Sequence, residues 1–261
     1  GALDDSVRHA MTKLSHIHFT TNEEAKNRIL KLGEEPWRVH NVGFPVIDLI
    51  KEQKYASFKE IHEKFGINKE KPVVLFTQHS VTTEYDLVSK QIKPALEAMY
   101  DLSKQGIQIV ITYPNNDAGG KKIIEDLIKL KKENVSNIQI HDSLGRYFYH
   151  GILNLCGSNG SGVCVGNSSS GIKETPAFGC PTVNIGSRQD GRLRSSNVID
   201  VDYNKKEIIN AINRGIYDNE FRSECGNCEN PYGKGNSGEE IARVLAGTKI
   251  SAELVQKKMT Y

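Results

Sequence analysis

The stretch Val163-Cys-Val-Gly166-Asn-Ser-Ser-Ser-Gly171-Ile-Lys-Glu174 joins a short apolar run to a serine-rich turn and the start of a helical pattern. The apolar run has the length and composition typical of a strand buried on both faces. Similar runs recur along the chain, and amphipathic stretches separate them. The expected strands cover residues 73–77, 107–112, 138–141, 163–166, 182–185 and 198–201, and the expected helices cover 83–104, 121–133, 144–155, 171–178 and 205–215.

This alternation of strands and helices predicts the fold class. Parallel strands joined by right-handed helical crossovers form a sheet with helices on both faces. We therefore expect an α/β protein with a Rossmann-like, doubly wound parallel sheet. The beginning of the chain differs, with helical patterns at 5–15, 22–32 and 56–65 and one weak strand signal near 38–42. A last helix is expected at 236–246, followed by a tail.

Composition and charge exclude several classes of protein. Among 261 residues, 34 Lys and Arg balance 32 Asp and Glu, so the net charge is +2 and nucleic-acid binding through bulk charge is not expected. No apolar run reaches the roughly 18 residues of a membrane span, and the first residues lack the regions of a signal peptide. Five cysteines, an odd number with three inside apolar runs, suit reduced thiols in a cytoplasmic protein.

The lone CxxC pair, Cys225 and Cys228, carries little weight as a metal site. A structural zinc site needs four ligands, and no second cysteine or histidine pair lies near by. We interpret the pair as ordinary loop thiols and expect neither a metal nor another cofactor.

The serine-rich turn suits a phosphate group. A strand end that leads into a helix exposes unpaired backbone N–H groups and the positive end of the helix dipole. The hydroxyls of Ser168, Ser169 and Ser170 add donors, and Gly171 removes a Cβ from the approach path. Glu174 would lie one helical turn further on, where it could accept hydrogen bonds from ribose hydroxyls. A serine-capped helix without a ligand explains the same residues, so the pattern alone leaves both interpretations open.

Other expected strands also end in polar loops. Arg188 and Arg192 follow the fifth strand, and the planar guanidinium suits phosphate. His79 follows the first strand, where a histidine could transfer protons near neutral pH. Asn116 and Asp117 follow the second strand. Surface charge, a histidine bonded to backbone and ordinary turn chemistry remain the alternatives at these positions.

Asp4 and Arg8, near the start of the chain, are spaced so that they share one helix face. A surface ion pair at the start of a helix explains this spacing without any role in a site.

Taken in order, these segments resemble one family, the hydrolysing UDP-N-acetylglucosamine 2-epimerases of sialic acid precursor synthesis. The matching segments are Asp4-Asp-Ser-Val-Arg-His-Ala-Met-Thr-Lys-Leu-Ser-His16, Gln78-His-Ser-Val-Thr-Thr83, Pro114-Asn-Asn-Asp-Ala-Gly119, Gly166-Asn-Ser-Ser-Ser-Gly-Ile-Lys-Glu174, Pro181-Thr-Val-Asn-Ile-Gly-Ser-Arg-Gln-Asp-Gly-Arg192 and Asn230-Pro-Tyr-Gly-Lys-Gly235. The segments at 82–83 and 167–170 match the hydrolysing pattern rather than the non-hydrolysing one.

The resemblance implies a glycosyltransferase-B-like architecture, in which a nucleotide sugar lies between two Rossmann-like halves. It also implies two sets of site residues. Those expected to bind the substrate or its UDP part are Ser168, Ser169, Ser170, Gly171, Glu174, Arg188, Asn116 and Asp117. Those expected to act in catalysis are His79, Asp4 and Arg8.

The resemblance implies a reaction in which UDP-N-acetylglucosamine (UDP-GlcNAc) is converted into free N-acetylmannosamine and UDP. A base removes the C2 proton while UDP leaves from C1, water then adds at C1, and a proton returns to the opposite face at C2. His79 would assist the departure of UDP or place the water. Asp4 would act as an acid or base, or as an orienting group held by Arg8. The phosphate pocket would stabilise charge on the leaving UDP.

The resemblance also predicts the domain organisation. We expect residues 1–50 to be the remnant of an N-terminal Rossmann-like domain, 51–235 to form a nucleotide-binding Rossmann-like domain, and 236–261 to form a helix and tail. Because family members begin with a whole N-terminal half, we expect this chain by itself to turn over little substrate. A glycine-rich loop at 157–162 is expected to be a flexible insertion that could alter the uridine pocket. A homodimer is one expected state, since family members are often dimers.

Two other functions stay open. A UDP-sugar glycosyltransferase would share the architecture, although the segments at 4–16 and 78–83 fit the epimerases better. A non-catalytic UDP-sugar-binding fragment would fit a chain with one complete half. The sugar is also open between UDP-GlcNAc and a related 2,4-diacetamido UDP-sugar.

Overall fold

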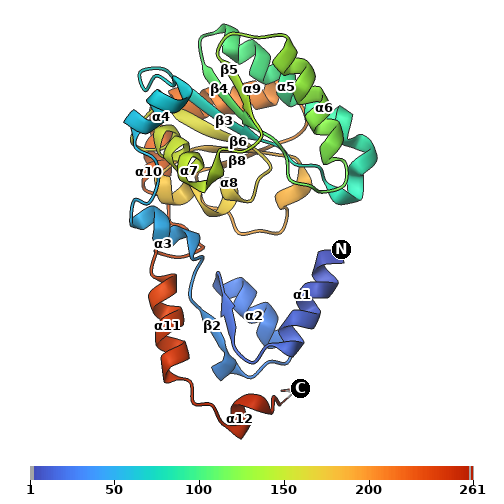
Figure 1. The fold of residues 1–261 in the computed structure, drawn as a ribbon, viewed down its shortest axis with the longest axis vertical. Coiled ribbons are helices and arrows are strands. Elements are labelled where there is room, and N and C mark those ends of the chain that lie inside the picture. The colour runs from blue at the N-terminus through green and yellow to red at the C-terminus, as the bar shows by residue number, and fades with distance from the viewer. Residues whose placement is uncertain (1–2, 259, 261) are drawn as a thin grey trace. The chain divides into compact units, whose positions relative to one another are not determined.

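A computed structural model describes residues 3–258 and 260 of the chain, with side chains from Ser6 onward. They form two compact units, one made of Gly1–Gln53 with Pro231–Tyr261 and the other of Lys54–Asn230. The chain therefore leaves the first unit, builds the whole of the second, and returns to the first (Figure 1).

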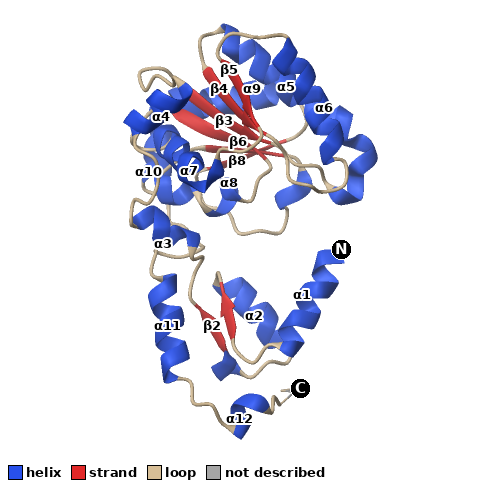
Figure 2. Cartoon of the chain, viewed as in Figure 1, coloured by secondary structure: helices blue, strands red, loops and turns tan. Residues whose placement is uncertain are grey.

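The larger unit contains a six-stranded sheet in which every neighbouring pair of strands is parallel, in the order β5-β4-β3-β6-β7-β8 (Figure 2). The strands are β3 (Val73–Thr77), β4 (Gln108–Thr112), β5 (Ile138–His141), β6 (Gly162–Gly166), β7 (Thr182–Ile185) and β8 (Val198–Val201). Each expected strand is present with bounds shifted by at most one residue. The predicted α/β class with a doubly wound parallel sheet is confirmed.

The helices of this unit also follow the sequence pattern. They are α4 (Phe58–Phe65), α5 (Val88–Lys104), α6 (Gly120–Lys132), α7 (Gly145–Cys156), α8 (Ser170–Lys173), α9 (Lys205–Tyr217) and α10 (Asn219–Gly226). Short 3-10 turns lie at η2 (Thr82–Leu87), η3 (Thr175–Phe178) and η4 (Ser187–Gln189). The sequence did not predict α10.

The core explains why the strands are continuous apolar runs in the sequence. Every residue of β3 is buried, because helices cover both faces of the sheet. Val74 and Phe76 join a cluster that includes Ile92 of α5 and Ile212 of α9. Helix α7 also contacts β3 and β6. Burying apolar side chains in this way stabilises the fold by roughly 1.5–3 kcal/mol for each large residue.

The strand order reverses between β3 and β6. From β3 the chain builds outward through β4 and β5, and from β6 it builds outward in the other direction through β7 and β8. The loops that follow β3 and β6 therefore diverge. In open α/β sheets, ligands bind beyond the carboxyl ends of the strands at such a reversal.

The helix after the serine-rich turn is shorter than expected. The pattern at 171–178 is divided into one turn of α-helix, α8, and the 3-10 turn η3. Pro176 has no N–H group and cannot continue the helical hydrogen bonds, so the α-helix ends before it. Because a single turn of helix has a small dipole, an anion bound at its start would be held by individual N–H groups rather than by the dipole of a long helix.

The glycine-rich loop at 157–162 lies at the amino end of β6, whereas the serine-rich turn leaves its carboxyl end. The loop and the serine-rich turn thus lie at opposite ends of the strand, and the expected effect of the loop on the uridine pocket remains a prediction. The guanidinium of Arg222 in α10 holds the loop, donating to the carbonyl oxygens of Gly157, Gly160 and Gly162 at 2.9, 2.8 and 3.0 Å.

The smaller unit contains a two-stranded parallel sheet of β1 (His18–Thr20) and β2 (Val39–Asn41). Its helices are α1 (Leu3–Leu14), α2 (Glu23–Lys31), α3 (Val46–Lys51), α11 (Ser237–Gly247) and α12 (Ala252–Val255), with a 3-10 turn η1 (Pro36–Arg38). Strand β1 and helices α3 and α12 were not expected from the sequence. Strand β1 has three residues, too few for an alternating pattern to stand out.

Buried charges attach the C-terminal segment to the smaller unit. The side chain of Glu34 is 1% exposed and pairs with Lys257 at 2.6 Å and His18 at 3.1 Å. Arg38 is fully buried and donates to the carbonyl oxygens of Glu253 and Leu254 at 2.6 and 2.8 Å. The C-terminal helix and tail therefore belong to the same compact unit as the start of the chain.

No helix in the described part of the chain is both long enough and apolar enough to cross a membrane.

Candidate functional site

The predicted site residues of the larger unit follow four strands at the carboxyl edge of the sheet. His79 follows β3, Asp117 follows β4, Ser168 follows β6 and Arg188 follows β7. Because parallel strands end at the same edge, the fold brings these loops together at the reversal of strand order.

His79 is held in one protonation form. Its Nδ1 accepts a hydrogen bond from the main-chain N–H of Asn115 at 2.9 Å, so the proton of the neutral ring lies on Nε2. Burial, with the positive charge of Arg188, lowers the pKa of His79 to about 4, and Asp117 opposes this only in part. At neutral pH, His79 is therefore an uncharged hydrogen-bond donor through Nε2 rather than an imidazolium acid.

Arg188 and Asp117 form an ion pair beside His79. Nη2 of Arg188 lies 3.3 Å from Oδ2 of Asp117, which also accepts a hydrogen bond from Nδ2 of Asn115 at 2.7 Å. The Arg188 side chain is 23% exposed, so it remains accessible to a ligand. Asn116 takes no part in this network: it is exposed and has no hydrogen-bond partner among the described residues.

The serine-rich turn presents free donors. The main-chain N–H groups of Ser168 and Ser169 have no acceptor in the described part of the chain, and both residues are half-buried. The hydroxyl of Ser170 is instead used inside the protein, where it contacts Tyr149 Oη at 2.6 Å and Ser168 Oγ at 3.0 Å. Two adjacent N–H groups at the end of a strand can cradle a phosphate oxygen.

Gly171 packs against the neighbouring strand. It is buried, and a Cβ at this position would lie 3.1 Å from Cγ2 of Thr182 on β7. The absent side chain therefore makes room for the sheet, and the expected role of Gly171 beside a ligand remains a prediction.

Glu174 is anchored by a buried histidine. Its Oε2 lies 2.8 Å from Nε2 of His150, whose side chain is 2% exposed. The other ring nitrogen, Nδ1, is buried without a partner among the described residues. His150 thus fixes one carboxylate oxygen of Glu174 and leaves Oε1 for another group.

Sequence reasoning missed two supports of the serine-rich turn. Tyr149 and His150 are neighbours on α7, and they contact Ser170 and Glu174. No spacing pattern links α7 to the serine-rich turn, so the sequence had no signal for these two residues.

Two residues that hold His79 were missed as well. Asn115 bonds its ring, and Asn167 bonds its main chain. Asn167 was visible in the serine-rich turn itself, but its contact with another loop depends on the order of the strands.

The remaining catalytic predictions fall in the smaller unit. Arg8 lies on α1, and its side chain is exposed. Asp4 lies on the same helix, but its side chain is outside the described residues. Their expected place beside the sugar remains a prediction.

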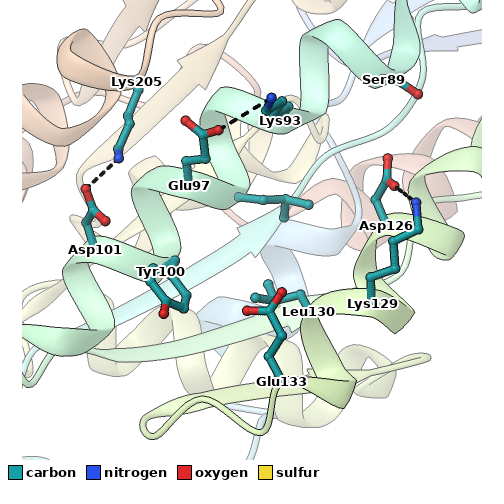
Figure 3. Close-up of a pocket in the computed structure, with 11 residues that line it drawn as sticks. Ser89, Lys93, Glu97, Tyr100, Asp101, Asp126, Lys129, Leu130, Glu133 and Lys205 are labelled. Atoms are coloured by element: carbon teal, nitrogen blue, oxygen red, sulfur yellow. Dashed lines mark hydrogen bonds and ion pairs between the residues drawn. The ribbon is translucent and has the colours of Figure 1, made fainter.

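A separate groove of about 790 Å³ lies along α5 and α6 (Figure 3). The lining side chains pair with one another, as in Lys205 with Asp101 at 2.6 Å and Lys129 with Asp126 at 2.7 Å. Lys93 pairs with Glu97 as well, so all three lysines of the groove are engaged, and none of the described site residues lines it.

Solved structures with a similar fold support the predicted architecture. A 2-epimerase of Neisseria meningitidis, solved with UDP-GlcNAc bound, aligns with a TM-score of 0.71 at 22% identity, over 91% of this chain and 63% of that one. A Listeria monocytogenes protein described as a UDP-N-acetylglucosamine 2-epimerase aligns with a TM-score of 0.67 at 18% identity, over 90% of this chain and 60% of that one. These similarities agree with the glycosyltransferase-B-like fold class.

The family follows from sequence comparison. The family model for UDP-N-acetylglucosamine 2-epimerases matches residues 1–246. This chain therefore belongs to the UDP-N-acetylglucosamine 2-epimerase family.

Two relatives are named as hydrolysing enzymes. The GDP/UDP-N,N'-diacetylbacillosamine 2-epimerase (hydrolyzing) of Campylobacter jejuni is 36% identical over 78% of this chain and 51% of its own length. The UDP-N,N'-diacetylbacillosamine 2-epimerase (hydrolyzing) of Legionella pneumophila is 31% identical over 100% of this chain and 65% of its own length. The chain thus spans about half to two-thirds of the length of these relatives.

Proposed function

We propose that this chain carries the UDP-binding half of a hydrolysing 2-epimerase, which converts a UDP-N-acetylated sugar into the free 2-epimer and UDP. The observation that carries the proposal is the meeting of His79, Asp117 and Arg188 beside the serine-rich turn, at the reversal of strand order. The family and the names of its hydrolysing members support the same interpretation.

The nucleotide part would bind through groups that the protein leaves available. The N–H groups of Ser168 and Ser169 and the guanidinium of Arg188 would donate to the diphosphate, whose charge suits a planar cation. Oε1 of Glu174 would accept a hydrogen bond from a ribose hydroxyl, while His150 holds Oε2.

His79 would act on the leaving group as a neutral donor. Its Nε2–H would donate to a phosphate oxygen as the bond from C1 to UDP breaks, and Arg188 would stabilise the charge that develops there. Bound diphosphate would raise the pKa of the ring, because a nearby anion favours the imidazolium. Asp4 and Arg8 remain our proposed residues for the C2 proton and the sugar.

We propose UDP-GlcNAc as the substrate, which is the sugar in the name of the family. UDP-N,N'-diacetylbacillosamine is the second candidate, because two relatives at 36% and 31% identity are named for it.

All five cysteines are free thiols, which supports our expectation of a reducing, cytoplasmic location.

The proposal is tested by following each UDP-sugar in D₂O by proton NMR, with the purified protein in the whole of its natural length. Release of UDP with a free 2-epimer deuterated at C2 is expected for one of the two sugars. The Arg188→Ala variant serves as the matched negative control. Release of UDP with retention of the C2 proton and of the starting configuration would contradict the proposal and favour simple hydrolysis or glycosyl transfer.

A further inference from the structure

Asn167 uses its whole side-chain amide on the main chain of His79. Oδ1 accepts from the N–H of His79 at 2.7 Å, and Nδ2 donates to the carbonyl oxygen of the same residue at 2.9 Å. Asn167 is 1% exposed, so water has little access to either bond. Two bonds from one planar group fix both the position and the tilt of the His79 main chain.

This contact crosses the reversal of strand order, from the end of β6 to the end of β3. The N–H of Asn167 also donates to the carbonyl oxygen of Thr77 at 3.2 Å. The preceding residue, Gly166, approaches β3 so closely that a Cβ would lie 1.9 Å from that oxygen, and its φ of 124° suits glycine. The serine-rich turn is therefore held against the loop that carries His79.

The carbonyl oxygen of Asn167 joins a third loop to the same point. It accepts hydrogen bonds from Nη1 of Arg188 at 3.2 Å and from Nε2 of Gln189 at 2.7 Å. A displacement of Asn167 would consequently change the place of the imidazole and of the guanidinium relative to the serine-rich turn.

From this geometry we propose that Asn167 is a positioning residue for His79, which sets the direction of the ring toward the leaving group of the bound UDP-sugar. Its part in turnover rests on the function proposed above. The role needs an asparagine, because the main chain of His79 offers one donor and one acceptor. An ionised Asp has no proton to donate to the carbonyl oxygen, and an Ala makes neither bond.

The kinetic test compares Asn167→Ala with the unmodified protein. We expect kcat to fall about 100-fold, the typical cost of a misplaced reacting group. The KM and the Kd for UDP should change little, because an Ala keeps the main-chain carbonyl oxygen that accepts from Arg188, and the N–H groups of Ser168 and Ser169 and the carboxylate of Glu174 remain. An unchanged kcat, or a loss of UDP affinity as large as the loss of kcat, would overturn the proposal.

A second readout needs no turnover. Imidazole ¹⁵N NMR at neutral pH should show the Nε2–H form of His79 in the unmodified protein, with Nδ1 held by Asn115. In Asn167→Ala the ring should become a mixture of the two neutral forms. In Asn167→Asp, the added carboxylate joins Asp117 against the charge of Arg188, so the ring should gain its proton at a higher pH.

Asn197→Ala is the matched control for a general loosening of the fold. Asn197 is also buried, but it lies at the amino end of β8, where its Nδ2 donates to the carbonyl oxygen of Cys180 at 2.7 Å. This variant should keep the Nε2–H form of His79.

An unchanged ring signal in both Asn167 variants would overturn the proposal. Failure of the protein to release UDP from any sugar would contradict the proposed function alone, since the ring signals still report on the Asn167 contact.

Discussion

The main-chain N–H of Asn115 donates to Nδ1 of His79 at 2.9 Å, and this bond decides which ring nitrogen remains for a ligand. A histidine with Nδ1 engaged as an acceptor presents Nε2–H, and it gains a second proton only by losing that bond. The contact lies between the loops after β3 and β4, so the fold itself sets the chemistry of the ring.

The depressed pKa of His79 predicts an acid-sensitive fold. The unfolded ring gains a proton near pH 6.5, whereas burial and Arg188 lower the pKa in the folded protein to about 4. Between these values the unfolded state binds more protons, so the contribution of His79 to stability is full above about pH 6.5 and falls as the pH drops toward 4. The loss of free energy of unfolding due to His79 should reach roughly 3 kcal/mol.

Denaturant unfolding at several pH values measures this effect. His79→Gln should lose less stability than the unmodified protein between about pH 6.5 and pH 4, because Gln does not titrate. His62→Gln, in α4, controls for the loss of a histidine elsewhere. Equal acid sensitivity of His79→Gln and the unmodified protein would show that the ring is not held neutral.

Replacing Arg188 by Lys should weaken UDP binding although the charge is kept. The guanidinium spans Asp117 and the carbonyl oxygen of Asn167, and a lysine ammonium cannot hold both while contacting a phosphate. We expect the Kd for UDP to rise roughly 10-fold, the equivalent of one charge-assisted hydrogen bond. Calorimetric titration with UDP provides the measurement, and an unchanged Kd would place the diphosphate elsewhere.

The anchored carboxylate of Glu174 predicts how the protein recognises ribose. UDP should bind more tightly than 2',3'-dideoxy-UDP to the unmodified protein, because Oε1 is left to accept from a ribose hydroxyl. Glu174→Gln should reduce this difference. Equal discrimination by both proteins would exclude a contact between Glu174 and the ribose.

The guanidinium of Arg222 should matter for stability and not for binding. It donates to five carbonyl oxygens in and around the glycine-rich loop, at the edge of the sheet opposite the serine-rich turn. Arg222→Ala leaves these oxygens without their partner, so the free energy of unfolding should fall by about 2–4 kcal/mol. The Kd for UDP, measured below the unfolding transition, should stay the same. A large change in that Kd would mean that the two edges of the sheet are coupled.

The sheet could be predicted from the sequence because its strands are Val- and Ile-rich runs buried on both faces. His79, Arg188 and the serine-rich turn could be proposed because each follows such a run. The contact between Asn167 and His79 could not, since it depends on β3 and β6 lying side by side although β4 and β5 come between them in the chain.

The contacts that α7 makes with the serine-rich turn could not be predicted from the sequence either. Helical spacing predicts which face of α7 is apolar, but Tyr149 and His150 form their bonds with a turn that the chain reaches only after β6. The same limit applies to Gly171, whose close neighbour Thr182 belongs to the next strand. To predict which loops contact one another, the order of the strands in the sheet must be known, and the sequence alone does not give that order.

Binding of UDP at the carboxyl ends of β3 and β6 can be measured by titrating the protein with UDP and following the imidazole ¹⁵N NMR signals of His79. UDP should shift the ring signals and raise the pKa of His79 above its value of about 4, because the diphosphate places negative charge beside the ring. Binding of UDP that leaves the ring signals and the pKa of His79 unchanged would show that the diphosphate does not lie at this site.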